Sequence, residues 1–188
     1  MADVEQGAPG VTGWKPGDRR AARASMIRVD QAGEYGATRI YAGQLAVMGD
    51  RSPLARSIAG MAQQEERHRA FFDRLIAERG VRPTLLQPLW NVAGFALGAA
   101  TAAIGPEAAM ACTAAVETEI DKHYADQLAA LGEEDSELSD AVAEFQAEEL
   151  EHRETALASG AESAPAYPLM SGMIRLGCRA AIALAKRI

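Results

Sequence analysis

The sequence predicts an all-α protein in which four long amphipathic helices form a bundle. Three observations favour this fold class. Alanine is abundant and β-branched residues are sparse, which suits helices and leaves almost no strand signal. Glycine and proline fall at intervals that suit helix ends. Apolar residues recur at helical spacing in four long segments, which short loops join in two pairs.

The first helical pair is expected over 21–48 and 53–79. Gly49 and Asp50 stop its first helix, and Pro53 opens its second. Glycine suits a helix C-terminus because it tolerates positive φ, and proline suits the first helical turn because no hydrogen bond from its nitrogen is needed there.

An apolar helix is expected over 88–104, and the second pair over 107–131 and 136–159. Residues 83–106 carry no charge, which by itself suggests a membrane span. The helical part, 89–104, is only about 24 Å long, whereas a hydrocarbon core is about 30 Å thick. We therefore expect a long apolar crossover that packs on the bundle.

A last helix is expected from Pro168 to the C-terminus. No acid follows Glu162, although the whole chain has a formal net charge of −7. The basic residues of this segment are Arg175, Arg179, Lys186 and Arg187. Two interpretations remain open: an amphipathic helix on an anionic membrane surface, or a helix that docks on the bundle with its basic residues outward.

Composition excludes several classes of protein. A chain of 188 residues suits one domain, expected over 21–188 after a flexible tail over 1–20. The tail has no apolar run and is not Arg-rich, so it resembles neither a signal peptide nor a mitochondrial presequence. A pI near 5.0 gives no electrostatic footprint for nucleic acid.

Cys112 and Cys178 are too few for a disulfide framework and are expected to be reduced, buried thiols.

Glutamate and histidine recur at a spacing that predicts a metal site. Two of the three histidines end a Glu-x-x-His motif, in which both side chains share one helix face. A lone glutamate precedes each motif, by 31 residues in the first half and 32 in the second. The six residues are Glu34, Glu65, His68, Glu117, Glu149 and His152. The chain thus resembles two copies of one helical pair.

The same spacing brings the six residues to one level of the bundle. The two loops are centred near Arg51 and Glu133, and each partner lies about 21–26 Å from its loop at about 1.5 Å per residue. Four carboxylates on apolar stripes would be costly without cations, and two divalent metals would balance them. This doubled pattern is the di-iron carboxylate arrangement of ferritin-like bundles, and its oxygen and nitrogen ligands favour iron or manganese over zinc.

His123 and Tyr124 are further candidates. Tyr124 follows Glu117 by seven residues and is expected to point inward, near the metals. His123 lies about 120° round the helix from Glu117. It is therefore either a surface or interhelical histidine or, with Tyr124, part of a proton and electron relay.

Five segments resemble the demethoxyubiquinone hydroxylases of ubiquinone biosynthesis, and the similarity runs from about Met26 to the C-terminus. The segments are VDQAGEYGATRIYAGQLAVM (29–48), EERHRAFF (65–72), ACTAAVETEIDKHYADQL (111–128), EFQAEELEHRETAL (144–157) and APAYPLMSGMIRLGCRAAIALAKRI (164–188). Members of that family are ferritin-like di-iron monooxygenases. The resemblance implies that the six residues named above bind two iron ions, and that His123 and Tyr124 match the family's His–Tyr pair.

The implied reaction hydroxylates the unsubstituted ring carbon of demethoxyubiquinol, or of its quinone, with O2 and two electrons. The resemblance implies NADH as the electron source, without a separate reductase, and no Gly-rich dinucleotide motif supports or excludes this. The polyprenyl tail of the quinol implies contact with membrane lipids through the C-terminal helix and the segment 85–104. We expect a bacterial protein attached peripherally to the cytoplasmic face of the inner membrane. A homo-oligomer and a lipid-presenting accessory protein are left open.

The main alternative is a ferritin-like protein that binds iron or scavenges peroxide. An uncharged crossover and a basic, apolar C-terminal helix argue against the soluble shell that such storage proteins form. A second alternative is a structural helical bundle that binds membranes. The duplicated set of candidate ligands argues against that interpretation.

Overall fold

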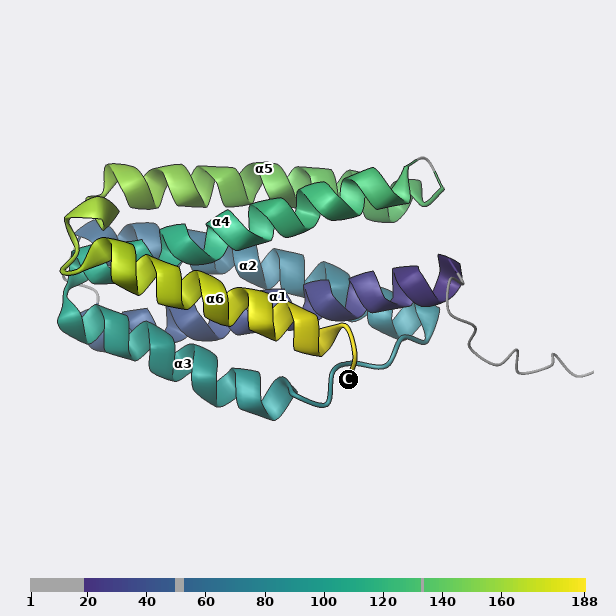
Figure 1. The fold of residues 1–188 in the computed structure, drawn as a ribbon, viewed down its shortest axis with the longest axis horizontal. Coiled ribbons are helices and arrows are strands. Elements are labelled where there is room, and N and C mark those ends of the chain that lie inside the picture. The colour runs from purple at the N-terminus through teal and green to yellow at the C-terminus, as the bar shows by residue number, and fades with distance from the viewer. Residues whose placement is uncertain (1–18, 50–52, 133) are drawn as a thin grey trace, which may run out of the picture.

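Helices make up nearly all of the described part of the chain. The computed structural model describes residues 19–49, 53–132 and 134–188. The predicted tail over 1–20 lies almost wholly outside these residues, as do the predicted loop centres at Arg51 and Glu133. The helices are α1 (Arg19–Met48), α2 (Pro53–Arg79), α3 (Gln87–Ile104), α4 (Pro106–Leu131), α5 (Ser136–Ala158), the 3₁₀ helix η1 (Ala161–Ser163) and α6 (Tyr167–Ala185) (Figure 1). No strand occurs within the described ranges, so the predicted all-α class is confirmed.

Every α-helix starts within two residues of its predicted position. Asp135 caps α5 as predicted, because its side chain accepts a hydrogen bond from the Leu138 backbone N–H at 3.4 Å. The 3₁₀ turn between α5 and α6 was not predicted. Gly160 opens this turn at a φ of 89°, a left-handed conformation that glycine adopts without strain.

The bundle consists of the pairs α1–α2 and α4–α5, which lie side by side in Figure 1. Two clusters of buried apolar residues fill it, one around Tyr41 and Met110 and the other around Phe72 and Val142. Each of the four helices contributes residues to both clusters. The middle of every helix is therefore held between two apolar layers, and the predicted metal ligands lie at that level.

The crossover α3 packs along α1, as predicted, and the contact is unusually close. A Cβ atom on Gly98 would lie 1.9 Å from the Ile40 carbonyl oxygen, and one on Gly43 would lie 2.2 Å from the Phe95 carbonyl oxygen. The two backbones can approach this closely only because both positions lack a side chain. The outer side of α3 exposes Leu89, Val92 and Phe95.

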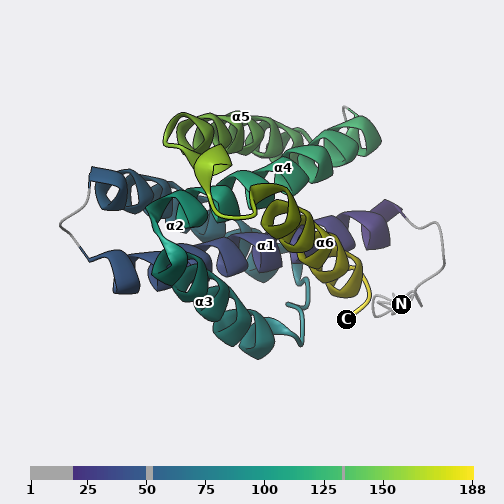
Figure 2. The same cartoon turned by 60° about the vertical axis from the view of Figure 1, so that its left-hand side comes forward.

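The C-terminal helix α6 lies across α4 and α1 (Figure 2). Two of its basic residues form ion pairs with the bundle: Arg175 Nε and Arg179 donate to Glu119 Oε1 of α4 at 2.6 and 3.3 Å. Arg179 remains exposed, whereas Arg175 is half-buried because it reaches the buried Glu119. Among the described helices, α6 is the one with the length and apolar composition to cross a membrane.

Both cysteines are free thiols, as expected, and Cys112 is buried. Cys178 is only half-buried, so the prediction of a buried thiol is wrong there. The reason is its place on α6, where Cys178 packs against the apolar cluster around Cys112 but also lines a cavity.

Gly98→Ala should destabilise the metal-free protein by about 1–3 kcal/mol, because the new methyl group would meet the α1 backbone, which cannot move alone. Urea denaturation measures this difference. Gly60→Ala on α2 is the matched control, since a Cβ there meets nothing within 4 Å. The control should leave stability unchanged or raise it by about 0.5–1 kcal/mol. Equal stability of the two variants would contradict the account of the α1–α3 contact.

Candidate metal centre

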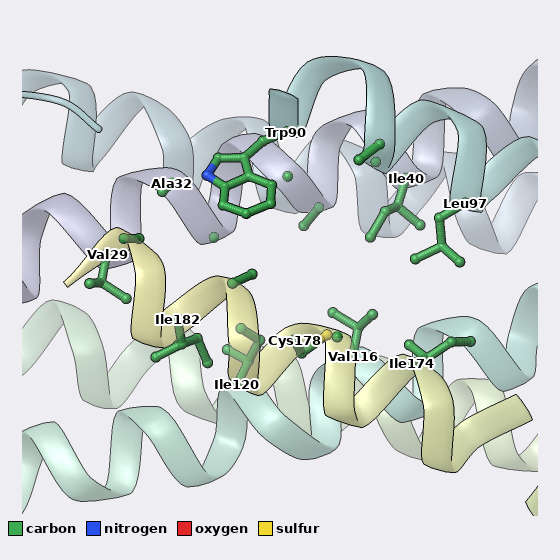
Figure 3. Close-up of a pocket in the computed structure, with 18 of the residues that line it drawn as sticks. Val29, Ala32, Ile40, Trp90, Leu97, Val116, Ile120, Ile174, Cys178 and Ile182 are labelled. Atoms are coloured by element: carbon green, nitrogen blue, oxygen red, sulfur yellow. The ribbon is translucent and has the colours of Figure 1, made fainter. Parts of the chain in front are cut away.

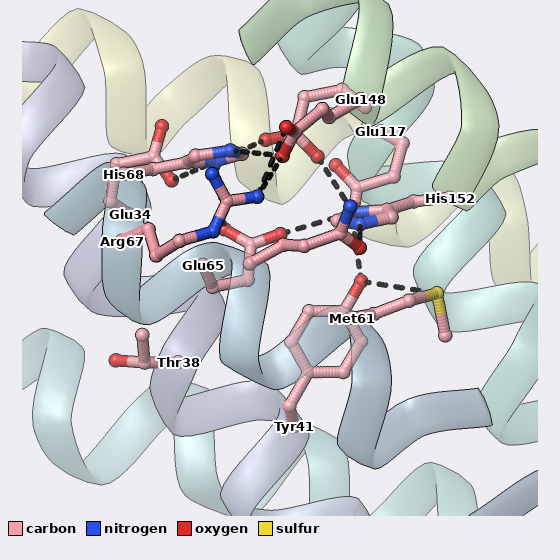
Figure 4. A network of polar contacts seen from close by, with 12 residues as sticks. Glu34, Thr38, Tyr41, Met61, Glu65, Arg67, His68, Glu117, Glu148 and His152 are labelled. Atoms are coloured by element: carbon pink, nitrogen blue, oxygen red, sulfur yellow. Dashed lines mark hydrogen bonds and ion pairs between the residues drawn. The ribbon is translucent and has the colours of Figure 1, made fainter. Parts of the chain in front are cut away.

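The structure brings all six predicted residues together in the middle of the bundle. Figure 4 labels all of them except Glu149. They form two overlapping groups, and within each group the candidate ligand atoms lie within 4.8 Å of one another. The first group is Glu34, Glu65, His68 and Glu149, and the second is Glu65, Glu117, Glu149 and His152. Glu65 and Glu149 belong to both, so they occupy the positions that would bridge two metal ions.

Both imidazoles present Nδ1 to the cluster. His68 Nδ1 lies 3.1 Å from Glu149 Oε1 and 3.5 Å from Glu34 Oε2. His152 Nδ1 lies 3.0 Å from Glu149 Oε2 and 3.2 Å from Glu65 Oε1. The Glu-x-x-His spacing explains this arrangement, because it places a carboxylate and an imidazole of one helix at the same point.

The cluster carries more negative charge than its surroundings can stabilise. Burial and the neighbouring carboxylates raise the pKa of Glu65 and of Glu117 well above its usual range. Burial alone would lower the pKa of His68, but hydrogen bonds to Glu149 and Glu34 raise it to about 10. Among the described residues, no lysine or arginine forms an ion pair with these four glutamates.

Two features show that the site fits metal ions. Glu65 Oε1 and His68 Nδ1 are buried and have no well-aligned hydrogen-bond partner, so both could bind a cation, His68 after the loss of its proton. The donors are carboxylate oxygens and imidazole nitrogens, a set that suits iron or manganese. Neither group of candidate ligands contains Cys112, which lies in a separate apolar cluster that packs against α6.

An outer pair of residues orients the two histidines, and the sequence analysis missed both. Glu148 Oε2 lies 2.8 Å from His68 Nε2 and also accepts from Arg67 at 2.9 Å. Gln64 Oε1 lies 2.8 Å from His152 Nε2. Each of these residues directly precedes the glutamate of one motif and contacts the histidine of the other. Their shared position in the repeat is the sequence signal from which both residues could have been predicted.

Two tyrosines hold the lone glutamates in a crossed arrangement. Tyr41 on α1 donates to Glu117 Oε1 on α4 at 3.0 Å, and Tyr124 on α4 donates to Glu34 on α1. The structure thus places Tyr124 inward, where it was expected, and adds Tyr41. The two tyrosines are separated by the same 83 residues as the two glutamates, so the repeat could have identified Tyr41.

His123 is a buried, interhelical residue, a position that is compatible with both of the interpretations left open. Its Nε2 atom lies 3.0 Å from Asp30 Oδ1 and 2.8 Å from Gln127 Nε2. Gln127 Nε2 also donates to Asp30 Oδ1 at 2.5 Å. Burial raises the pKa of Asp30, while the contacts with His123 and Gln127 oppose that rise. Asp30 and Gln127 were not predicted, because their meeting depends on how α1 faces α4.

An apolar cavity of about 450 Å³ lies between α1, α3, α4 and α6, with Trp90 and Ile182 on opposite sides (Figure 3). A second, much smaller cavity adjoins it, and Val29, Gly33, Ile120 and Ile182 line both. The smaller cavity is also lined by Asp30, Glu34, His123 and Tyr124. The large cavity and the Glu34 side of the cluster are therefore separated only by the small cavity and the residues that the two cavities share.

Comparison with known proteins finds close similarity over most of the chain. Residues 21–185 match the family described as Ubiquinone biosynthesis protein COQ7. The chain is 53% identical to the 3-demethoxyubiquinol 3-hydroxylase of Rhodospirillum rubrum, over 92% of this chain and 82% of that protein. It is 54% identical to the mitochondrial NADPH-dependent 3-demethoxyubiquinone 3-hydroxylase of Rattus norvegicus, over 89% and 79% of the two chains. It is 44% identical to the mitochondrial 5-demethoxyubiquinone hydroxylase of Saccharomyces cerevisiae, over 87% and 77%.

Glu148→Gln should weaken divalent metal binding about tenfold, because the carboxylate that orients His68 and increases its basicity is replaced by an amide. Anaerobic titration calorimetry with Fe²⁺ measures the effect. Glu151→Gln is the matched control, since Glu151 is an exposed residue of the same helix. Identical isotherms for the two variants would show that the Glu148 contact does not support metal binding.

Proposed function

This chain belongs to the COQ7 family of ubiquinone biosynthesis proteins, and on that premise we propose that it is a monooxygenase, a 3-demethoxyubiquinol 3-hydroxylase. The reaction adds a hydroxyl group to the quinol ring with O2. One structural observation supports this function above all others: a doubled Glu and Glu-x-x-His cluster lies beside an apolar cavity. The names of the relatives favour the hydroxylase over the ferritin-like alternative.

We propose that the six clustered residues bind two iron ions. Glu34 and His68 would hold one ion and Glu117 and His152 the other, with the remaining two glutamates shared. Two divalent cations balance four carboxylates, which removes the unfavourable charge described above. When bound, the iron pair supplies the redox chemistry that activates O2.

Tyr124 and His123 have a proposed role between the cavity and the cluster. Burial and the Glu34 carboxylate raise the pKa of Tyr124 well above its usual value, so its hydroxyl stays protonated and donates to Glu34. His123 lines the same small cavity and is held by Asp30. We propose that the pair passes a proton between a ring in the cavity and the Glu34 carboxylate.

We propose a reduced nicotinamide nucleotide as the electron source. The family resemblance implies NADH, whereas the relatives from rat, mouse and human are named NADPH-dependent. The sequence carries no Gly-rich dinucleotide motif, so the nucleotide would bind without one.

We propose that α3 and α6 together form the membrane-facing surface of the protein. Both helices line the large cavity, and both expose large apolar side chains to solvent. These residues are Leu85, Leu89, Val92, Phe95 and Ile104 in and beside α3, and Leu169, Met173, Leu176 and Leu184 in α6. The polyprenyl tail of a quinol would then pass from the cavity directly into lipid.

Peripheral attachment fits α6 better than a membrane span. Although α6 is long and apolar enough to cross a membrane, its Arg175 and Arg179 bind Glu119 of the bundle. A spanning orientation would break these contacts and leave Glu119 without two of its cations. Several relatives are named mitochondrial; for this chain we propose the cytoplasmic face of the bacterial inner membrane.

A bacterial strain that lacks its own demethoxyubiquinol hydroxylase tests the function and the cluster together. The wild-type chain should clear the accumulated demethoxyubiquinone and restore ubiquinone, as chromatography of lipid extracts would show. Glu149→Ala should restore none, because a shared carboxylate is lost, whereas exposed Glu151→Ala should behave as wild type. Failure of the wild-type chain would sink the hydroxylase assignment, and rescue by Glu149→Ala would sink the proposed role of Glu149.

The membrane surface has a separate test. Replacing Met173 and Leu176 together with glutamate should weaken cosedimentation with anionic lipid vesicles at least tenfold, since each buried apolar side chain contributes about 1.5–3 kcal/mol. Leu157→Glu is the control, because Leu157 is also exposed but lies on α5. Equal binding of both proteins would place the membrane contact elsewhere.

A further inference from the structure

Asp30 is a buried carboxylate with one oxygen unused. Its side chain is fully buried, and Oδ1 receives both of its contacts, from His123 Nε2 at 3.0 Å and Gln127 Nε2 at 2.5 Å. Oδ2 is buried and makes no hydrogen bond. A buried acceptor without a donor is costly, and such an atom in a native protein requires an explanation.

The surroundings of Asp30 indicate that a ligand could supply the missing donor. Asp30 lines the small cavity that also borders Glu34 and Tyr124, and half of the residues around this cavity also line the large apolar cavity. A molecule with an apolar tail in the large cavity would therefore bring a polar head to Asp30 and to the Glu34 side of the cluster.

The repeat shows that this acceptor belongs to one half of the molecule only. The offset of 83 residues that relates Glu34 to Glu117 relates Asp30 to Thr113 and Ile40 to His123. The second half thus has a threonine where the first has the carboxylate, and the first half has isoleucine where the second has the histidine. The Asp30–His123 pair breaks the symmetry of the cluster on the side where the cavity lies.

We propose that Asp30 selects the reduced form of the substrate by accepting a hydrogen bond at Oδ2 from a ring hydroxyl of the quinol. An ionised carboxylate accepts hydrogen bonds and cannot donate them. A quinol ring carries two hydroxyl donors, whereas the quinone carries only carbonyl oxygens, which a carboxylate would repel. His123 and Gln127 hold the carboxylate through Oδ1, which leaves Oδ2 without a partner and available for this hydrogen bond.

This inference rests on the proposed function and refines it. Relatives of this chain are named for the quinol or for the quinone. The arrangement at Asp30 assigns the quinol as the form that this site binds. A hydrogen bond to a charged group of this kind contributes about 1.5–3 kcal/mol, which corresponds to a preference of roughly tenfold or more.

Anaerobic titration calorimetry on the iron-loaded protein tests the proposal, with a short-chain demethoxyubiquinone analogue and its quinol as probes. The wild-type protein should bind the quinol at least tenfold more tightly than the quinone. In Asp30→Asn that preference should fall to less than threefold, chiefly through weaker quinol binding. Thr113→Asn, the equivalent position in the other half, should keep the wild-type preference.

The outcomes separate this inference from the proposed function. Equal binding of quinol and quinone by the wild-type protein would overturn the role of Asp30, even if Asp30→Asn failed to fold. An equal loss of affinity for the quinol and the quinone in Asp30→Asn would also overturn it, since a purely structural role of Asp30 would produce that result. Failure of the wild-type protein to bind either ligand would overturn the proposed function and the inference together.

Discussion

The burial of four glutamate carboxylates at one level of the bundle is the constraint on which the rest of the structure depends. Each carboxylate lies between two apolar clusters, so water cannot stabilise its charge. Tyr41 and Tyr124 each donate one hydrogen bond, which does not offset four negative charges. The raised pKa of Glu65 and of Glu117 is the response of a metal-free cluster to this conflict. Binding of two divalent cations, as we propose, would resolve the conflict and thereby couple metal binding to stability.

The proposed function depends on the part of the site in which the two halves of the chain differ. The ligands, the two tyrosines and the residues behind the histidines repeat almost perfectly between the halves. Asp30 and His123 have no equivalents, and they lie on the side that α3 and α6 enclose as an apolar cavity. The symmetric part of the site suits a pair of metal ions, and in our proposal the asymmetric part determines which side of that pair the substrate approaches.

Local sequence patterns predicted the features that depend on a single helix. They did not predict contacts between side chains of two different helices. The helix starts and the Glu-x-x-His motifs depend on spacing along one helix, so they could be read from the sequence. The contact of Asp30 with His123 depends on which face of α1 opposes α4, and no local pattern determines that. The inward turn of Arg175 likewise requires Glu119 on a different helix. Gly98 lies in the predicted crossover helix, but its contact with Ile40 exists only in the folded protein.

The central claim is that the cluster binds two metal ions as a coupled pair, and the most direct test is the iron content and magnetic state of the purified protein. Elemental analysis combined with Mössbauer spectroscopy should find two iron ions per chain, spin-coupled to each other in the oxidised protein. One iron per chain, or two that behave as isolated ions, would contradict the sharing of Glu65 and Glu149 and with it this account of the fold.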